Sequence, residues 1–281
     1  MTRKITKYKS HVRQANVLFL DIEVSPTLGW SYGQYNTNVI KVELPPVLLS
    51  FSWKWLGDDC GPKCLTIVDE ALPDKTDHRL LVQKLWELLD EASVVVTHNI
   101  DFDVKMANAF FIRCGLKPPK PYKTVCTLKL ARGRFKFDCN KLDYLCGLLF
   151  DEHKTEITNN DVWHQILYGD KKTRKRCSNL LKEYNNQDVA LLEKLYLRML
   201  PYTCNHPNLS LLIGKSWICP LCGHEAEFRV KAYRTTGAQV NGIQCLCSHC
   251  GGYVTRKLTK EERQELSELG ELQSTFRILP A

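Results

Sequence analysis

The stretch Val17–Val24, with the sequence VLFLDIEV, constrains the fold more than any other part of the chain. Its apolar and β-branched residues predict a buried strand. Successive side chains of a strand point to opposite faces, so Asp21 and Glu23 point to the same face. Two carboxylates held so close repel each other, and burial raises that cost. A divalent cation would relieve the repulsion, although strand ends also carry acids that simply meet solvent.

Length and composition restrict the classes of protein that the sequence can form. The chain has 281 residues, enough for one well-buried domain and a smaller module. No apolar run approaches the length needed to span a bilayer, and the apolar stretch after the basic start is too short for a signal peptide. We therefore expect a cytoplasmic protein without membrane contact (in the host cytoplasm, if it is viral). The net charge of +8 is compatible with a polyanionic partner without requiring one.

Hydrophobic periodicity predicts a mixed α/β domain. After the first strand come a loop with aromatic and polar residues, and then two strands joined by a short turn, which together suggest an antiparallel meander. Helical and strand patterns alternate from there, and the last part of the domain is helical until Pro201 stops it. The expected strands cover 17–24, 47–55, 63–68, 93–97 and 122–126. The expected helices cover 74–90, about 100–114, 142–149, 162–168 and about 173–200.

A third acid lies where a central strand gives way to a helix. In the stretch 98–103, Asp103 falls one turn into that helix and can face the edge of the sheet. Asp101 competes for the same role, because the two side chains point roughly 200° apart on a helix and cannot both face one point. Phe102 is expected to anchor the turn in the core. The same acids could also be a favourable helix start without further function.

A fourth acid lies in the long helix near the end of the domain. Tyr184 and Asp188 are four residues apart and are therefore neighbours on one helix face. The leucines around them turn this face toward the core, where an aspartate needs partners. A tyrosine–aspartate pair can also be plain structural hydrogen bonding.

Taken in order, these motifs carry a resemblance to a known group of enzymes. The acid-x-acid strand end, the His-Asn-x-x-Phe-Asp junction and the Tyr-x3-Asp helix resemble the three exonuclease motifs of the DEDD superfamily, in its tyrosine-carrying subgroup, over about residues 15–200. The chain is similar in texture to the exonuclease domain of family B DNA polymerases and its stand-alone bacterial and phage versions. The features that carry this likeness are Asp-Ile-Glu at 21–23 followed by Ser-Pro at 25–26, and a second strand that ends in Lys-Trp-Leu-Gly at 54–57. One departure is visible: these relatives often have Asp-Thr-Leu where this chain has Cys-Thr-Leu at 126–128.

The resemblance implies a ribonuclease H-like fold and two divalent ions, Mg²⁺ or Mn²⁺. By the family pattern, Asp21 bridges both ions, Glu23 and Asp188 complete the first site, and Asp103 supports the second through water. Tyr184 orients the attacking water. The implied activity is hydrolysis of DNA from a single-stranded 3′ end, in replication, repair or recombination. The sequence itself does not separate DNA from RNA as the substrate, although we favour DNA.

The chain has 13 cysteines, and one cluster of them indicates a metal site. Cys219-Pro-Leu-Cys222-Gly and Cys247-Ser-His-Cys250-Gly are two knuckles that flank strand-like runs. In a chain without a secretion signal, such a cluster favours metal over disulfides. The spacing predicts a closed, structural zinc ribbon with four thiolate ligands. Three further residues are near the knuckles: Cys245 as a bystander, and His224 and His249 as possible substitutes.

Weaker candidates for nucleic-acid contacts are basic residues or residues next to the acidic motifs. They comprise Asn99, Phe102, Lys171, Lys172, Arg174, Lys175, Arg176, Arg229 and Arg234. The basic residues at 171–176 and those of the ribbon, Arg229 and Arg234, could each touch phosphate or be a solvated surface. The ribbon could instead bind a protein partner.

We divide the sequence into five parts: a basic arm (1–14), a nuclease domain (15–201), a linker (202–214), the zinc ribbon (215–258), and a C-terminal helix with a tail (259–281). Glu262 would complete a capping box in that last helix. Three alternatives to a DNA exonuclease remain open. They are a 3′–5′ exoribonuclease of the same fold, a non-catalytic nucleic-acid-binding protein with a degenerate nuclease fold, and a zinc-ribbon adaptor.

Overall fold

The computed structural model describes residues 15–33, 35, 38–69, 74–154, 157, 161–215, 218–225, 227–236, 239–258, 260–261 and 263–264. The chain forms two compact units, one that ends at Met199 and one that begins at Leu200. The predicted basic arm (1–14) and the predicted capping residue Glu262 lie outside the described residues.

The first unit is built on a mixed five-stranded sheet. Its strands are β1 (Val17–Val24), β4 (Leu48–Trp55), β5 (Lys63–Thr66), β6 (Val94–Thr97) and β7 (Lys123–Cys126), in the order β5-β4-β1-β6-β7. The first three strands pair antiparallel, as the predicted meander requires, whereas β6 pairs parallel with both β1 and β7. The acidic strand β1 is therefore central, and its side chains face covered layers on both sides.

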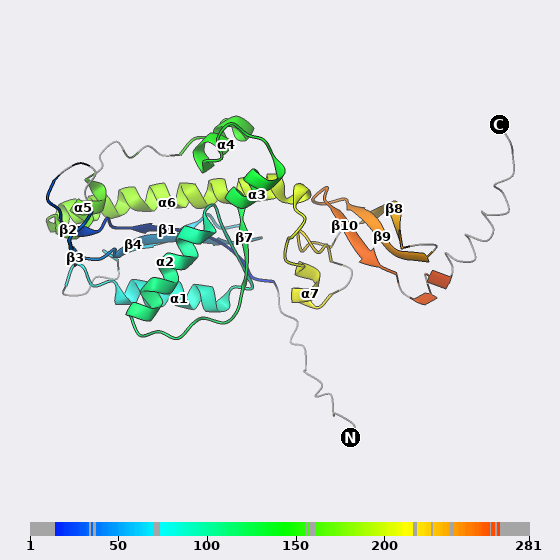
Figure 1. Cartoon of the computed structure of the whole chain (residues 1–281), viewed down its shortest axis with the longest axis horizontal. Coiled ribbons are helices and arrows are strands. Elements are labelled where there is room, and N and C mark those ends of the chain that lie inside the picture. Colours follow the sequence, from blue (N-terminus) through cyan, green and yellow to red (C-terminus); the bar gives the residue numbers. More distant parts are fainter. Residues whose placement is uncertain are drawn as a thin grey trace, which may run out of the picture. The chain divides into compact units, whose positions relative to one another are not determined.

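Helices cover both faces of this sheet (Figure 1). Helices α1 (Arg79–Glu91) and α2 (Ile100–Arg113) pack on one face, and the long helix α6 (Lys171–Met199) crosses the other, with α5 (Val162–Tyr168) beside it. The core between the layers contains fully buried side chains such as Leu18, Phe51, Phe110 and Leu181. This arrangement confirms the predicted α/β class with a sheet flanked by helices.

Two further helices follow the last strand of the sheet. Helix α3 (Thr127–Arg134) was not predicted and begins directly after β7, and α4 (Leu142–Phe150) follows it. The thiol of Cys126 caps α3, because its Sγ accepts a hydrogen bond from the Lys129 amide at 3.4 Å. The cysteine that departs from the family pattern thus has a local structural contact.

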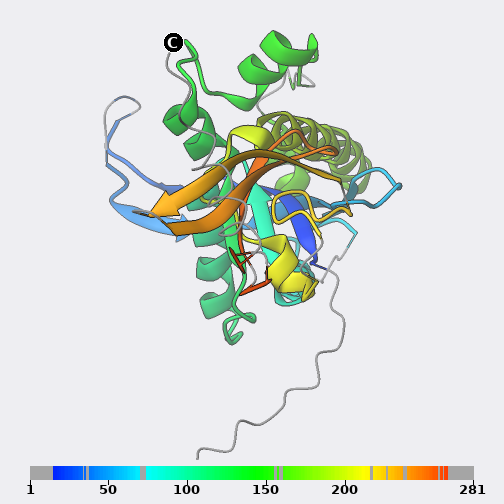
Figure 2. The same cartoon turned by 90° about the vertical axis from the view of Figure 1, so that its right-hand side faces the viewer.

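A small hairpin replaces part of the loop predicted after the first strand. Strands β2 (Leu28–Trp30) and β3 (Lys41–Leu44) pair antiparallel, with an irregularity at Gly29. A Cβ atom at Gly29 would lie 2.5 Å from Val39 Cγ1 and 2.6 Å from the Lys41 carbonyl oxygen, so only glycine permits this close approach. The hairpin projects from the sheet, to the left in Figure 2.

The second unit contains a three-stranded antiparallel sheet. The predicted linker stretch (202–214) contains the short helix α7 (Leu209–Ile213), and the residues described at 260–261 and 263–264 are helical. The sheet consists of β8 (Phe228–Thr236), β9 (Gln239–Cys247) and β10 (Tyr253–Lys257), in the order β10-β9-β8. The ribbon thus has a third strand beyond the two that the sequence suggested. Among the described residues, no helix is long and apolar enough to cross a membrane.

Candidate active site

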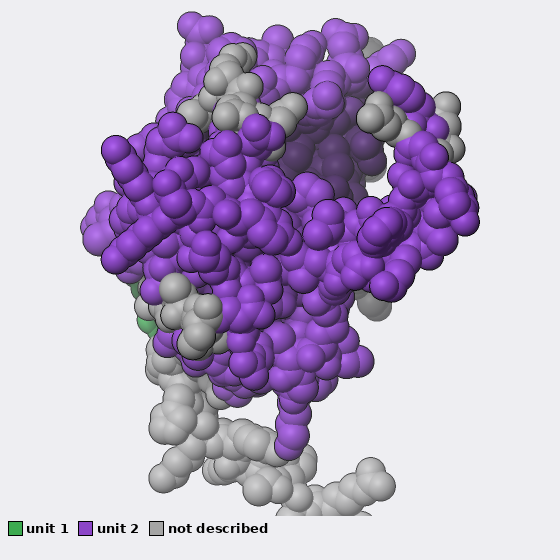
Figure 3. All heavy atoms as spheres, turned by 90° about the vertical axis from the view of Figure 1, so that its left-hand side faces the viewer, with its two compact units in different colours: residues 1–13, 200–281 green, residues 14–199 purple. Residues whose placement is uncertain are grey.

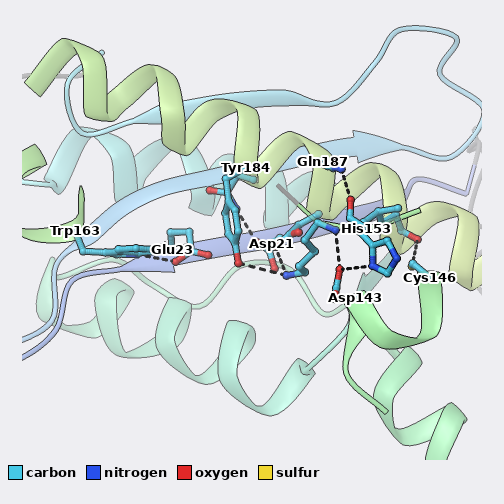
Figure 4. Close-up of polar contacts among 12 residues, drawn as sticks. Asp21, Glu23, Asp143, Cys146, His153, Trp163, Tyr184 and Gln187 are labelled. Atoms are coloured by element: carbon cyan, nitrogen blue, oxygen red, sulfur yellow. Dashed lines mark hydrogen bonds and ion pairs between the residues drawn. The ribbon is translucent and has the colours of Figure 1, made fainter. Parts of the chain in front are cut away.

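The end of β1 and the middle of α6 bring three acids together. Asp21 and Glu23 face α6 from the central strand, and Asp188 comes down from the helix with 2% of its side chain exposed. Carboxylate oxygens of these three residues all lie within 4.8 Å of one another. Three of the four acids singled out in the sequence therefore form one cluster. Figure 4 shows Asp21, Glu23 and Tyr184 beside one another between β1 and α6.

The structure separates the two aspartates that compete at the start of α2. Asp103 is 4% exposed and lies near enough to Asp21 to raise its pKa, whereas Asp101 is half exposed and pairs with Lys129 at 2.7 Å. The inward-facing residue is thus Asp103. Phe102 is 42% exposed, so the expectation that it anchors the turn in the core is wrong; the neighbouring Ile100 is buried instead.

Burial and mutual repulsion change the acidity of this cluster. Burial raises the pKa of Asp21 well above its usual range, and the charges of Asp103, Asp188 and Glu23 raise it further. Burial also raises the pKa of Glu23, and it raises that of Asp103 to about 7. Without a counter-charge, carboxylates in this arrangement tend to keep protons. The cluster is therefore an electrostatically strained site that a cation would stabilise.

A lysine that the sequence analysis did not single out lies inside the cluster. Lys154 Nζ donates a hydrogen bond to Asp188 Oδ2 and lies 3.5 Å from the Tyr184 hydroxyl and 5.2 Å from the centroid of its ring. Burial alone would lower the pKa of Lys154, but the attraction and hydrogen bond of Asp188 outweigh it and raise that pKa overall. Lys154 follows helix α4 in an irregular stretch, where no periodic pattern marks a functional residue.

Two other contacts hold the acids in place. Asn185 Nδ2 donates to Asp21 Oδ2 at 2.6 Å, and the buried Ser50 hydroxyl donates to Asn185 Oδ1 at 2.5 Å. Trp163 Nε1, from α5, donates to Glu23 Oε2 at 3.0 Å, as Figure 4 shows. Sequence reasoning missed both positioning residues, although Asn185 directly follows the tyrosine of the last motif.

The donor set of this cluster fits a hard divalent cation. It consists of carboxylate oxygens, the ligands that Mg²⁺ and Mn²⁺ prefer. Asp188 Oδ1 is buried and has no hydrogen-bond partner in the part of the chain that the structure describes. A buried acceptor of this kind is costly unless a ligand or water satisfies it. The unpartnered oxygen and the raised pKa values thus both indicate a place for a cation.

The four cysteines of the two knuckles form a second metal-type group. The Sγ atoms of Cys219, Cys222, Cys247 and Cys250 lie within 4.8 Å of one another. Each knuckle closes through a glycine amide, from Gly223 to the Cys219 carbonyl at 2.9 Å and from Gly251 to the Cys247 carbonyl at 3.0 Å, and both glycines have positive φ. Four convergent thiols fit a structural zinc ion. The group does not include Cys245, which is buried nearby.

The two histidines near the knuckles stack on each other. Their ring centroids are 3.8 Å apart, and His224 and His249 form a further three-residue group with Cys222. The complete four-thiol set needs neither of them.

The weaker candidates for nucleic-acid contacts divide into two kinds. The block 171–176 is the start of α6, and four of its basic residues, Lys171, Lys172, Lys175 and Arg176, are exposed. Arg174 is partly buried, and its Nε donates to the Ile166 carbonyl at 2.8 Å. Arg174 therefore has a structural contact. The other candidates (Lys171, Lys172, Lys175, Arg176, Asn99, Phe102, Arg229 and Arg234) all have exposed side chains.

A comparison with protein families decides the class of the first unit. Residues 63–167 match the family model RNase_T, described as an exonuclease. The chain carries an exonuclease domain. A domain of this family implies a 3′–5′ exonuclease, which is a hydrolase that uses divalent metals and acts on nucleic acid. No curated protein matches the chain.

The match covers only part of the candidate site of this exonuclease domain. It includes Asp103 and Lys154, but it begins after Asp21 and Glu23 and ends before α6. The geometry described above joins the remaining acids to the matched segment, because β1 and α6 lie against the strands and helices within it.

Proposed function

We propose that the chain is a metal-dependent 3′–5′ exonuclease that removes nucleotides from the 3′ end of DNA, in replication, repair or recombination. The observation that carries the proposal is the convergence of Asp21, Glu23 and Asp188, with the buried Asp103 acting on Asp21. The match to an exonuclease family over residues 63–167 supports it independently.

Four carboxylates would hold the catalytic metal ions. Asp21 would serve both ions, Glu23 and Asp188 would help to hold one of them, and Asp103 would support the other. Two Mg²⁺ or Mn²⁺ ions, when bound, would activate a water molecule and neutralise charge on the scissile phosphate. The oxygen-only donor set and the unpartnered Asp188 Oδ1 support this assignment.

The protein's own side chains position the reacting groups. Burial raises the pKa of Tyr184, so its phenol stays protonated at neutral pH and can donate a hydrogen bond to the attacking water. Burial raises the pKa of Asp188, and the positive charge of Lys154 opposes this rise and so favours the ionised form of the carboxylate. Asn185 fixes the orientation of Asp21 through its hydrogen bond of 2.6 Å.

We further propose that Cys219, Cys222, Cys247 and Cys250 hold one structural zinc ion. A zinc ion, when bound, would supply folding free energy to the second unit. The closed set of thiols leaves no open position for catalysis. The exposed Arg229 and Arg234 on β8 could then contact phosphate, or the ribbon could bind a protein partner.

One assay tests the proposed reaction. A 5′-labelled single-stranded DNA and an RNA of the same sequence are incubated with the purified protein and Mg²⁺, Mn²⁺ or EDTA. We expect a ladder of products shortened from the 3′ end, release of nucleoside monophosphates, and no reaction in EDTA. Degradation of the RNA faster than the DNA would favour the alternative function, a 3′–5′ exoribonuclease. No degradation of either strand under any metal would contradict the proposed activity.

The matched control for Asp103 is Asp101, an acid on the same helix, α2, that faces away from the cluster. Asp101→Asn removes an exposed carboxylate on α2, whereas Asp103→Asn removes a buried one two residues later. We expect only the second to lose activity. Equal losses in both variants would contradict the assigned site.

A further inference from the structure

The β2–β3 hairpin carries a group of exposed aromatic side chains. Trp30 is 66% exposed, Tyr32 is 94% exposed and Tyr35 is 85% exposed. Large aromatic groups are usually among the more buried residues of a soluble domain. Several of them together on one projecting element therefore mark a contact surface.

The indole of Trp30 is held in position although it is exposed. Its Nε1 donates to Glu43 Oε1 at 2.7 Å, and Lys41 Nζ pairs with the same oxygen at 2.8 Å. The ring nitrogen is thus satisfied within the hairpin, and Trp30 loses little additional freedom when something stacks on the ring. The charges of Lys41 and Glu43 cancel each other, so this surface offers little attraction for phosphate.

The hairpin lies close to the acidic cluster along the chain. Leu28 is the fourth residue after the end of β1, and Trp30 is seven residues after Glu23. Even a fully extended chain places Trp30 at most about 25 Å from that carboxylate. Figure 3 shows one face of the first unit (residues 14–199, purple), with a hollow and, to its right, a projecting arm. A strand whose 3′ end lies at the acids is therefore within reach of the hairpin after a few nucleotides.

We propose that the β2–β3 hairpin is a stacking platform for unpaired bases of the substrate strand, upstream of its scissile 3′ end. The inference rests on the proposed exonuclease function. Its occupant is single-stranded nucleic acid, because every base has a π-face and stacks on aromatic side chains without sequence preference. The nearly neutral charge of the platform indicates contact with bases rather than with the phosphate backbone.

The test compares a long oligothymidylate with two probes that cannot reach or use the platform. One probe is the p-nitrophenyl ester of thymidine 5′-monophosphate, which occupies only the acidic site. The other is an oligonucleotide of equal length whose 3′-terminal nucleotides carry bases and whose remaining nucleotides are abasic. We expect Trp30→Ala to raise KM for the oligothymidylate roughly 5- to 150-fold, since one base–aromatic stack contributes about 1–3 kcal/mol. The kcat should not change, and neither should KM for the ester or the abasic strand.

Three further variants and a control separate stacking from loss of structure. Trp30→Phe keeps an aromatic face and should retain most of the affinity, whereas Tyr32→Ala and Tyr35→Ala should each lose part of it. Ile112→Ala, which removes a side chain that is 79% exposed on α2, is the control and should have no effect. An unchanged KM for the oligothymidylate in Trp30→Ala, or an equal rise on the ester, would overturn the proposal.

Direct binding keeps this test separate from the test of hydrolysis. Anisotropy of a labelled oligonucleotide in EDTA measures affinity without turnover, so the platform can be supported or overturned even if no substrate is cleaved. Loss of a dimer in Trp30→Ala, measured by light scattering, with unchanged oligonucleotide affinity, would show that a second copy of the chain covers the hairpin, and this result would also overturn the proposal.

Discussion

The side-chain amide of Asn185 donates a hydrogen bond of 2.6 Å to Oδ2 of Asp21, across 164 residues of sequence. Asn185 accepts in turn from the Ser50 hydroxyl, so a buried chain of hydrogen bonds leads from β4 through α6 to the central acid. The next residue, Asn186, makes a similar bond with Ser52 at 2.5 Å but no such contact with Asp21. Both asparagines thus accept a hydrogen bond from a serine of β4, but only Asn185 also donates one to the carboxylate of Asp21.

Replacing Asn185 should reduce turnover as well as stability. Asn185→Ala leaves the Ser50 hydroxyl without this partner and removes a hydrogen bond to a carboxylate, at a cost of about 1–3 kcal/mol in the free energy of unfolding. We expect kcat to fall because Asp21 is no longer held in one orientation. Asn186→Ala is the control, and it should lower stability with little effect on kcat. Urea unfolding and steady-state kinetics check both variants, and equal kinetic effects would contradict the positioning role.

Removing a metal ligand should abolish hydrolysis while the fold persists. In Asp21→Asn one carboxylate of the repelling cluster becomes neutral, so the stability of the metal-free protein should hold or rise. Asp188→Asn also removes the ion pair with Lys154 and should lower that stability, although the protein should still fold. Calorimetric titration with Mn²⁺ should show weaker binding, and the nuclease assay should show a loss of several orders of magnitude. Near-normal turnover with unaltered Mn²⁺ affinity would refute the assigned ligands.

Tyr184→Phe should slow the reaction without stopping it. In the proposed mechanism the phenol positions the attacking water, and effects of positioning and proton handling are on the order of 10²–10⁴-fold. The aromatic ring remains, so the contact between this ring and Lys154 should survive. A single-turnover experiment with saturating Mg²⁺ measures the change, and a wild-type rate would show that the tyrosine is only structural.

The metal-free protein should lose stability as the pH rises from about 4 to about 7. The pKa of Asp103 is about 7 in the folded chain against a usual value of 3.8, so within this window the folded form binds more protons than the unfolded form. The contribution of Asp103 to the free energy of unfolding is complete below pH 4, falls between pH 4 and pH 7, and is absent at higher pH. Its total is on the order of 4 kcal/mol at most. Asp103→Asn should flatten this dependence and raise stability at pH 8. Thermal unfolding in EDTA across the pH range tests it, and an unchanged slope in the variant would contradict the assignment.

The second unit should contain one zinc ion that is independent of the catalytic metals. Cys219→Ser or Cys250→Ser should unfold the second unit, because zinc binding is expected to supply much of the folding free energy of that unit. The nuclease activity of the first unit should remain. Cys245→Ala is the control, since this cysteine is buried but outside the group of four. Elemental analysis and limited proteolysis check the result, and a freshly reduced protein without zinc would disprove it.

The parts of the site that the sequence predicts are those with a local pattern. Asp21 and Glu23 end an apolar strand, and Asp188 lies among leucines at helical spacing, so each acid is marked by its own element. Lys154 has no such element, and only the packing of an irregular stretch against α6 brings it to Asp188. The position of Lys154 at the site therefore cannot be predicted from the sequence.

The elements of the fold that the sequence does not predict are short or have exposed side chains. Strands β2 and β3 have three and four residues, and exposed side chains dominate both, so no alternation of buried and exposed positions marks them. Helix α3 contains Gly133 and begins without a turn after β7, and both properties hide a helix from pattern analysis.

The order of the elements along the chain determines when nuclease activity can arise during synthesis. Asp21 and Glu23 are translated long before Asp188 and its neighbour Asn185, which lie on α6, the last element of the first unit. Until that helix has left the ribosome and docked on the sheet, the site lacks one of its three clustered carboxylates. A nascent chain that stalls before α6 is therefore expected to be inert toward the messenger RNA and the DNA around it.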